Sequence, residues 1–150
     1  MRLSENSNRL FKEFFDQCRL CEGFEFPDVN VFARRGAWLL TSILMVDGIT
    51  LGANVFVHPK FTWRTPSDKL NIERKLMAHE LAHVLQYKRL GFVRFLRDYI
   101  RDFWTIFSKK KKWSPRTWFE SYLEIPHEIE ARKLADEFID WVDTPESGIS

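Results

Sequence analysis

The chain has 150 residues, of which 45% are hydrophobic and 29% charged, a composition that suits one soluble globular domain with a sizeable core. Its formal net charge of +2 gives no indication of nucleic-acid binding, although basic residues are concentrated between Lys88 and Arg116. The N-terminus lacks the apolar segment of a signal peptide, and no run of about eighteen apolar residues is present. We therefore expect a cytoplasmic protein without a spanning helix, or one that is peripheral to a membrane or exported by a non-classical route.

A helix is predicted near the N-terminus, over residues 8–21, because apolar residues recur there at spacings of three and four. It ends with the only two cysteines, Cys18 and Cys21, which form a single C-x-x-C pair. A structural zinc site usually needs a second such pair, and a redox-active pair needs a strand-to-helix context. We expect two reduced thiols here.

A small, mostly antiparallel sheet is predicted next, over residues 29–57. Short apolar and β-branched runs predict strands at residues 29–32, 38–46, 49–51 and 55–57. Asp47-Gly48 is a hairpin-turn signal between the second and third of these strands, and Gly52-Ala53-Asn54 is predicted as a kink or second turn before the fourth.

The next predicted element is a long helix over residues 66–90. Thr65 can cap it, Pro66 suits its first position and Asp68 stands where a capping box places an acid. Gly91 can end it.

Two further helices are predicted after Gly91. An amphipathic segment over residues 92–112 has apolar side chains on one side and arginines on the other, and it ends in four lysines. The last helix, over residues 126–142, begins at Pro126. The sequence thus predicts an α+β fold with a single domain over residues 1–150.

Residues 79–83 read His-Glu-Leu-Ala-His, an H-E-x-x-H pattern within the predicted helix 66–90. His79 and His83 lie about 40° apart around such a helix and one turn apart along it, so that both imidazoles can reach one cation. Glu80 lies about 100° from His79, where it can act on a water without binding the metal. The pattern is typical of zinc peptidases, in which zinc lowers the pKa of water and the glutamate takes the proton. The alternative is two surface or hydrogen-bonded core histidines.

A zinc site of this kind needs a third protein ligand. The extended pattern H-E-x-x-H-x-x-G-x-x-H is absent, because residue 86 is Gln and residue 89 is Arg. The remaining candidates are His58, His127, Glu124, Glu128 and Glu130.

The predicted helix 126–142 favours Glu128 among these candidates. Glu128 shares a face with the apolar residues of this helix, whereas Glu130 lies on the charged face. A buried carboxylate must be paired or bound to a metal. His127 lies near the same face and is the rival, and Glu128 is alternatively a first-turn acid favoured by the helix dipole. His58 is more consistent with a loop residue or a substrate contact.

The segments HELAHVLQ (residues 79–86) and PHEIEA (126–131) resemble the gluzincin-type zinc peptidases, whose third ligand is a glutamate on a later helix. With GITLGANVFVHP (residues 48–59), the chain resembles the small metallopeptidase domains associated with bacterial contractile-injection and toxin systems. The resemblance covers roughly residues 29–140, and HELAHVLQ is its specific part.

This resemblance implies a minimal zincin-like domain, in which a small sheet packs on the H-E-x-x-H helix and on a C-terminal glutamate helix. It implies Zn²⁺ held by His79, His83 and Glu128, with Glu80 as the general base. It also implies that the strand near Val55–Val57 pairs with an extended peptide substrate. Tyr122 is a candidate donor to the oxyanion, although a packed tyrosine is the simpler interpretation.

The aromatic and basic segment over residues 92–113 has three interpretations. It can pack its apolar side on the core, form a wall beside the zinc cleft, or lie on an anionic membrane surface through Trp104, Trp113 and Lys109–Lys112. The sequence therefore predicts a zinc-dependent peptidase acting on a peptide or protein. The alternative is a catalytically silent zinc-bound module that recognises a protein partner or a membrane surface.

Overall fold

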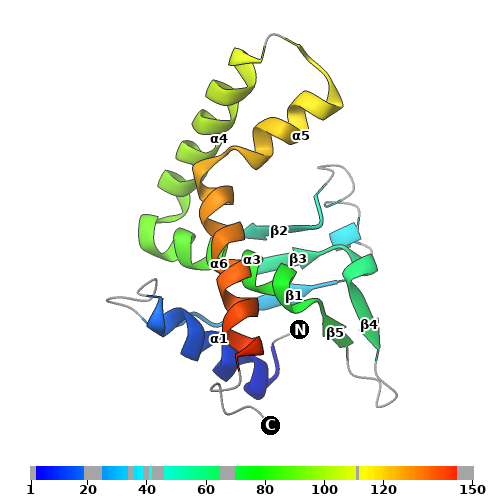
Figure 1. Cartoon of the computed structure of the whole chain (residues 1–150), viewed down its shortest axis with the longest axis vertical. Helices are drawn as coiled ribbons and strands as arrows, with labels where there is room; N and C mark the ends of the chain where they lie inside the picture. The colour runs from blue at the N-terminus through cyan, green and yellow to red at the C-terminus, as the bar shows by residue number, and fades with distance from the viewer. Residues whose placement is uncertain are drawn as a thin grey trace.

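A computed structural model describes residues 3–18, 25–33, 36–38, 41, 46–64, 70–110 and 112–144. The chain has the predicted α+β class (Figure 1). Its helices are α1 (Glu5–Gln17), the 3-10 helix η1 (Pro59–Phe61), α3 (Arg74–Leu90), α4 (Phe92–Lys109), α5 (Pro115–Leu123) and α6 (Pro126–Asp143). Its strands are β1 (Asn30–Phe32), β2 (Gly48–Leu51), β3 (Asn54–Val57), β4 (Thr62–Arg64) and β5 (Leu70–Ile72).

The sheet is mixed, which corrects the prediction of a mostly antiparallel one. The described strands form a three-stranded sheet in the order β1-β3-β2, in which β1 pairs with β3 in parallel and β2 pairs with β3 antiparallel. A separate antiparallel pair joins β4 to β5. Strand β3 has a partner on each side, so the prediction that Val55–Val57 is open to a peptide is wrong. Strand β2 lies at an edge of the described sheet instead.

The predicted strand over residues 38–46 is also wrong where the structure describes it, because Trp38 and Thr41 are helical. A short apolar run does not distinguish a buried strand from a helix by its periodicity, which explains the error. The hairpin turn lies at Gly52 and Ala53, between β2 and β3, and Gly52 has a φ of 63° that favours glycine. Gly48, predicted as a turn residue, is the first residue of β2.

Helix bounds differ from the predictions at several places, and the amphipathic segment predicted over residues 92–112 is helical only to Lys109. The predicted helix 66–90 begins only at Arg74, after β5, while the capping residues expected at 65–68 lie outside the described residues. The predicted helix 8–21 is α1, which begins at Glu5 behind the N-cap Ser4 and ends at Gln17. Helix α5 was not predicted, although Ser114 caps it by accepting a hydrogen bond from the Thr117 N–H.

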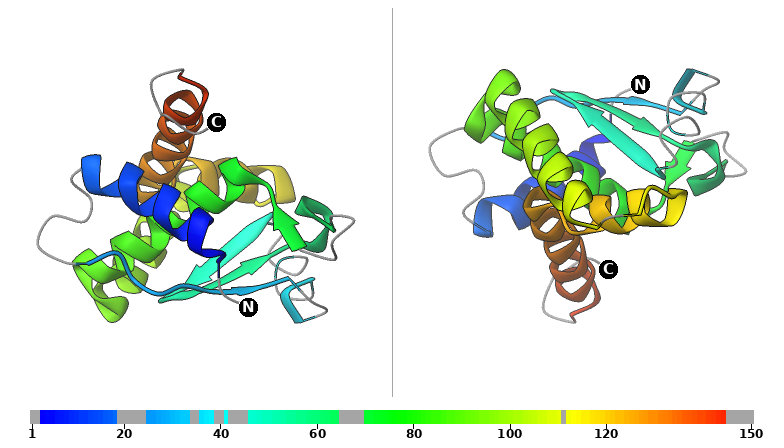
Figure 2. Two further views of the ribbon diagram at one scale, coloured as in Figure 1. Left: turned by 90° about the horizontal axis from the view of Figure 1, so that it is seen from below. Right: turned by 90° about the horizontal axis from the view of Figure 1, so that it is seen from above.

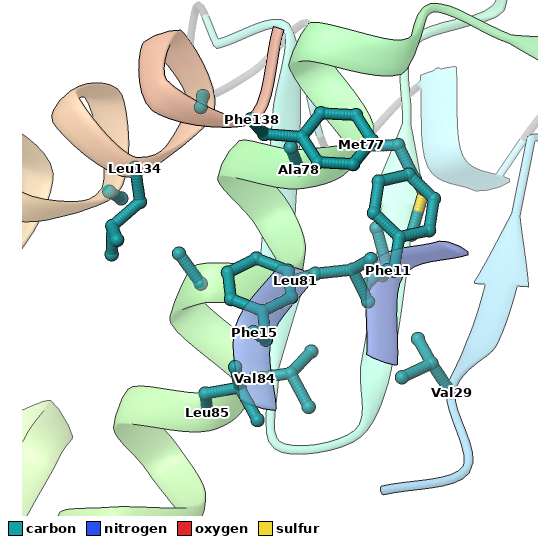
Figure 3. Packing of buried hydrophobic residues seen from close by; sticks show 14 of the residues in the cluster. Phe11, Phe15, Val29, Met77, Ala78, Leu81, Val84, Leu85, Leu134 and Phe138 are labelled. Carbon is teal, nitrogen blue, oxygen red and sulfur yellow. The ribbon is translucent and has the colours of Figure 1, made fainter. Parts of the chain in front are cut away.

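One hydrophobic core joins the sheet to α1, α3 and α6 (Figure 3). Phe11 stacks on Phe138 with ring centroids 4.7 Å apart, which fixes α1 against α6. Buried Leu81 and Leu85 place the inner face of α3 in the same core. The helices α3 and α6 are therefore held against each other by core residues within the H-E-x-x-H segment and next to it.

Helices α4 and α5 extend from one end of the molecule, while α1 and the C-terminal end of α6 lie toward the other end (Figure 1). The views in Figure 2 show α3 and α6 on the same side of the three-stranded sheet. A second, smaller cluster of Phe103, Phe107 and Ile125 joins α4 to the start of α6. Among the described residues, no helix combines the length and the apolar character needed to cross a membrane.

Candidate metal centre

Three side chains from two helices meet in the interior. His79 and His83 come from α3 and Glu128 comes from the first turn of α6, and their ligand atoms lie close enough together to bind one metal ion. The two Nε2 atoms are 3.2 Å apart. The His79 Nε2 atom is 3.2 Å from Oε2 of Glu128, and the His83 Nε2 atom is 3.1 Å from Oε1.

A network around Gln86 fixes the orientation of the His83 ring. The Gln86 amide nitrogen donates to Glu130 Oε2 at 2.7 Å and to the His127 carbonyl at 3.1 Å, so the amide oxygen faces His83. That oxygen lies 2.8 Å from Nδ1 of His83 and accepts its proton. The Nε2 atom is thereby directed toward Glu128 and His79, as a metal ligand requires.

The donor set fits a bound metal cation, zinc among them, on two observations. Glu128 Oε2 is buried without a hydrogen-bond partner, although the His79 ring lies beside it, so this oxygen has an unused lone pair aimed into the site. Tetrahedral zinc with bonds of about 2.0–2.1 Å would place its ligand atoms about 3.3 Å apart. The separations of 3.1 and 3.2 Å approach this value before any metal is added.

Electrostatics pair Glu128 with the two imidazoles. Burial raises the pKa of Glu128, but the interactions with His83 and His79 lower it by more, so this carboxyl is ionised. Burial lowers the pKa of His83, but the nearby Glu128 carboxylate raises it by more. The net effect raises the pKa of His83 to about 9. A metal cation would take the place of the proton shared by this group.

Tyr99 of α4 is a contact that sequence reasoning missed. Its hydroxyl donates to Glu128 Oε1 at 2.6 Å. Burial and the negative charge of Glu128 raise the pKa of Tyr99, so the hydroxyl keeps its proton and remains a donor. Helix periodicity places Tyr99 on the apolar side of its helix but does not identify its partner. That partner, Glu128, lies 29 residues away in the sequence, beyond the reach of local patterns.

Glu80 is buried on the β2 side of α3. Thr50 donates to Glu80 Oε2 at 2.7 Å and also reaches the Glu80 carbonyl at 3.1 Å. A Cβ atom on Gly48 would lie 2.8 Å from Cδ of Glu80, so glycine is needed for the carboxylate to approach the strand. Burial raises the pKa of Glu80, although the nearby histidines and Thr50 oppose this shift.

The other candidate ligands lie outside the triad and make different contacts. The His127 ring lies 4.8 Å from the Phe95 ring, and Glu130 accepts from Gln86 and Arg89. Glu124 pairs with Lys110 at 2.6 Å. His58 caps η1 by accepting from the Lys60 N–H.

A cavity of about 190 Å³ lies beside the triad. Glu80, His83 and Glu128 line it together with Tyr122, the predicted oxyanion donor. Burial, followed by the charges of Glu128 and Glu80 and by an interaction of the hydroxyl with the Glu128 carboxylate, raises the pKa of Tyr122, so its hydroxyl also stays protonated. The remaining walls come from β2, α4 and α5.

Residues 17–91 match the model of the family described as the eCIS core domain, where eCIS denotes the extracellular contractile injection system. This match covers half of the chain, and the chain therefore belongs to that family, which is consistent with an association with contractile injection systems. The match contains His79 and His83 and ends at Gly91, before Glu128. No curated protein and no solved structure matches the chain.

Proposed function

We propose that this member of the eCIS core domain family is a zinc-dependent peptidase of the zincin type. The observation that carries the proposal is the meeting of two imidazole nitrogens and one carboxylate at 3.1 and 3.2 Å, with a buried glutamate next to the first histidine in the sequence. Two histidines and a glutamate form a donor set typical of catalytic zinc, which leaves one position open.

His79, His83 and Glu128 would hold the ion. Zinc bound there supplies a Lewis acid for the substrate carbonyl and lowers the pKa of water. Glu80 accepts the proton of the attacking water and returns it to the leaving amine. Thr50 orients the Glu80 carboxylate through its 2.7 Å hydrogen bond, and the raised pKa of Glu80 makes it a stronger base than an exposed glutamate.

Two tyrosines have separate roles in this proposal. Tyr99 holds the Glu128 carboxylate through its hydrogen bond and is a positioning residue. Tyr122 lines the cavity with Glu80 and keeps its proton, so it is the candidate to donate a hydrogen bond to the oxyanion of the reacting carbonyl.

The substrate in this proposal is a peptide in extended form. Strand β2 is paired with β3 on one side, and its residues Gly48–Leu51 line the cavity. An extended peptide can add to the edge of β2 by backbone hydrogen bonds, which would present a peptide bond to Glu80.

The decisive experiment compares wild type with Glu80→Gln on a peptide library in the presence of zinc. We expect the wild type to cleave peptides and Glu80→Gln to lose cleavage by about 10²-fold or more, while its zinc content stays unchanged. Glu137→Gln, an exposed position on α6, is the matched control and should retain both properties. Equal cleavage by wild type and Glu80→Gln would refute the proposed mechanism.

The second candidate function is a catalytically silent zinc-bound module that recognises a protein partner or a membrane surface. The observation that favours it is the exposure of large aromatic side chains on α4, α5 and the segment between them, which are Trp104, Trp113, Trp118 and Phe119. Zinc binding without cleavage of any library peptide by the wild type would favour this function over the peptidase.

A further inference from the structure

The cavity beside the triad has a polar end and an apolar end. Its polar end is formed by the carboxylates of Glu80 and Glu128 and by His83. Its apolar lining comes from three elements: Ile49 and Leu51 of β2; Phe95, Leu96 and Phe103 of α4; and Trp118 of α5. An apolar space that adjoins a cluster of ionisable groups is the usual form of a small-ligand site.

The capacity of this cavity suits one large apolar group. A buried cavity of about 150 Å³ lined by Leu, Ile and Phe binds benzene. The cavity here measures about 190 Å³, and the walls of its apolar end have similar chemistry. It can therefore hold a phenyl ring and the atoms that link it to a backbone.

The walls also indicate how such a group would be attached. Strand β2 supplies one wall, and successive side chains of an extended chain point to opposite faces. A peptide paired with β2 would thus direct every second side chain to one face, and the cavity lies next to that edge. The opposite wall comes from α4 and α5.

From these observations we infer that the cavity is a specificity pocket for an aromatic or large aliphatic side chain next to the bond presented to Glu80. The inference rests on the proposed peptidase function for the identity of the ligand as a peptide. Leu96, Phe103 and Trp118 are the specificity-determining residues.

The first test measures binding, which does not depend on turnover. Zinc-loaded Glu80→Gln protein is titrated with N-acetyl-phenylalanine amide and with N-acetyl-alanine amide by calorimetry or NMR. Burial of the ring predicts an affinity about 10- to 100-fold higher for the phenylalanine compound. Equal affinity for the two compounds would overturn the inference.

Variants of α4 locate the bound group. Leu96→Trp fills the cavity and should lower the affinity for the phenylalanine compound at least about 10-fold. Val93→Trp, on the same helix but 79% exposed and outside the lining, is the matched control and should leave the affinity unchanged. Leu96→Ala enlarges the cavity and should shift the preference from N-acetyl-phenylalanine amide toward N-acetyl-tryptophan amide, which keeps the test valid if Leu96→Trp fails to fold.

The cleavage data separate this inference from the proposed function. Cleavage by the wild type with no preference for large apolar side chains would overturn the inference and leave the peptidase intact. Selective binding of the phenylalanine compound without any cleavage by the wild type would support the pocket and refute the peptidase.

Discussion

The helices that carry the candidate metal ligands are packed very differently from the α4–α5 hairpin, the pair of helices at residues 92–123. Between Met77 and Tyr87 of α3, every residue except His79 is buried. In the 18 residues of α4, by contrast, only Phe95, Phe103 and Phe107 are buried. The family match includes α3 and stops at Gly91, just before the hairpin begins.

This difference in burial corresponds to two different structural requirements. A helix buried on nearly all sides holds its side chains in one arrangement, which a metal site needs. A helix buried along one stripe can change its other side chains at small cost in stability. We therefore expect changes near α3 to alter metal binding and chemistry, and changes in the hairpin to alter ligand preference.

The largest effect is expected from Glu128→Ala, which removes the one member of the His79–His83–Glu128 cluster that does not come from α3. Zinc at 100 times its dissociation constant should stabilise the wild type against unfolding by about 2.7 kcal/mol. Glu128→Ala should lose this zinc-dependent stabilisation, because the two imidazoles that remain are too few ligands to hold the ion tightly. Thermal unfolding with and without zinc measures it, and Glu137→Ala on the exposed face of α6 is the control. Full zinc stabilisation of Glu128→Ala would show that the third ligand lies elsewhere.

The next effect is expected from Gly48→Ala, which tests how α3 meets β2. The added methyl group would overlap the Glu80 carboxylate and displace it from Thr50. We expect peptide cleavage to fall by about 10²-fold with zinc content retained. Gly36→Ala is the control, because nothing lies within 4 Å of the methyl group it would add. Unchanged cleavage by Gly48→Ala would mean that the position of Glu80 does not matter.

These two variants also show what the sequence could and could not predict. The spacing of His79 and His83 depends only on helix geometry, and the apolar face of α6 identified Glu128, so the triad was accessible to local patterns. The role of Gly48 was not, because it depends on how close α3 lies to β2. The same holds for Thr50 and its bond to Glu80 across 30 residues.

The fold, like the metal site, was predictable where local sequence signals determine it. Helix α6 has strong signals, namely Pro126 at its start and a continuous apolar face, and its observed bounds agree with the predicted ones to within a residue. The strand order was not predictable, because the parallel pairing of β1 with β3 is made by tertiary contacts. The predicted start of α3 failed for the same reason, since residues 70–72 pair with β4.

A smaller effect is expected from Gln86→Leu, which retains the volume and removes the hydrogen bond to His83. Partners that orient a ligand histidine typically contribute 10- to 100-fold to metal affinity. We expect zinc affinity to fall within that range, as measured by competition with a chelator. Gln17→Leu, at an exposed position of α1, is the control. Unaltered affinity would mean that packing alone orients the His83 ring.

Tyr99→Phe and Tyr122→Phe test the point at which the hairpin touches the metal site. Tyr99→Phe removes the 2.6 Å hydrogen bond to Glu128, and we expect zinc affinity to fall about tenfold, or ~1.4 kcal/mol. Tyr122→Phe should lower the rate of cleavage more than it lowers zinc affinity, although its hydroxyl also interacts with Glu128. Chelator competition and peptide kinetics on both variants measure the two effects. The reverse result would exchange the roles of the two tyrosines.

The smallest effect on the metal site is expected from Trp113→Ala, at the tip of the hairpin. Trp113 is 79% exposed and contacts Phe107 at a centroid distance of 4.9 Å, outside the cavity lining. Its removal should change the free energy of unfolding by less than about 1 kcal/mol and leave zinc affinity and cleavage unaltered. Trp118→Ala, which opens the cavity next to Phe103, should reduce the preference for aromatic peptides.

Vesicles of anionic lipid add a second measurement to this pair. If the hairpin tip docks on a membrane, as the alternative function requires, Trp113→Ala should weaken sedimentation with the vesicles and Trp118→Ala should affect it less, because Trp118 is about half as exposed. Equal vesicle binding by both variants and the wild type would leave the cavity wall as the role of α4 and α5. The two tryptophans thus distinguish a hairpin that shapes a substrate pocket from one that anchors the protein.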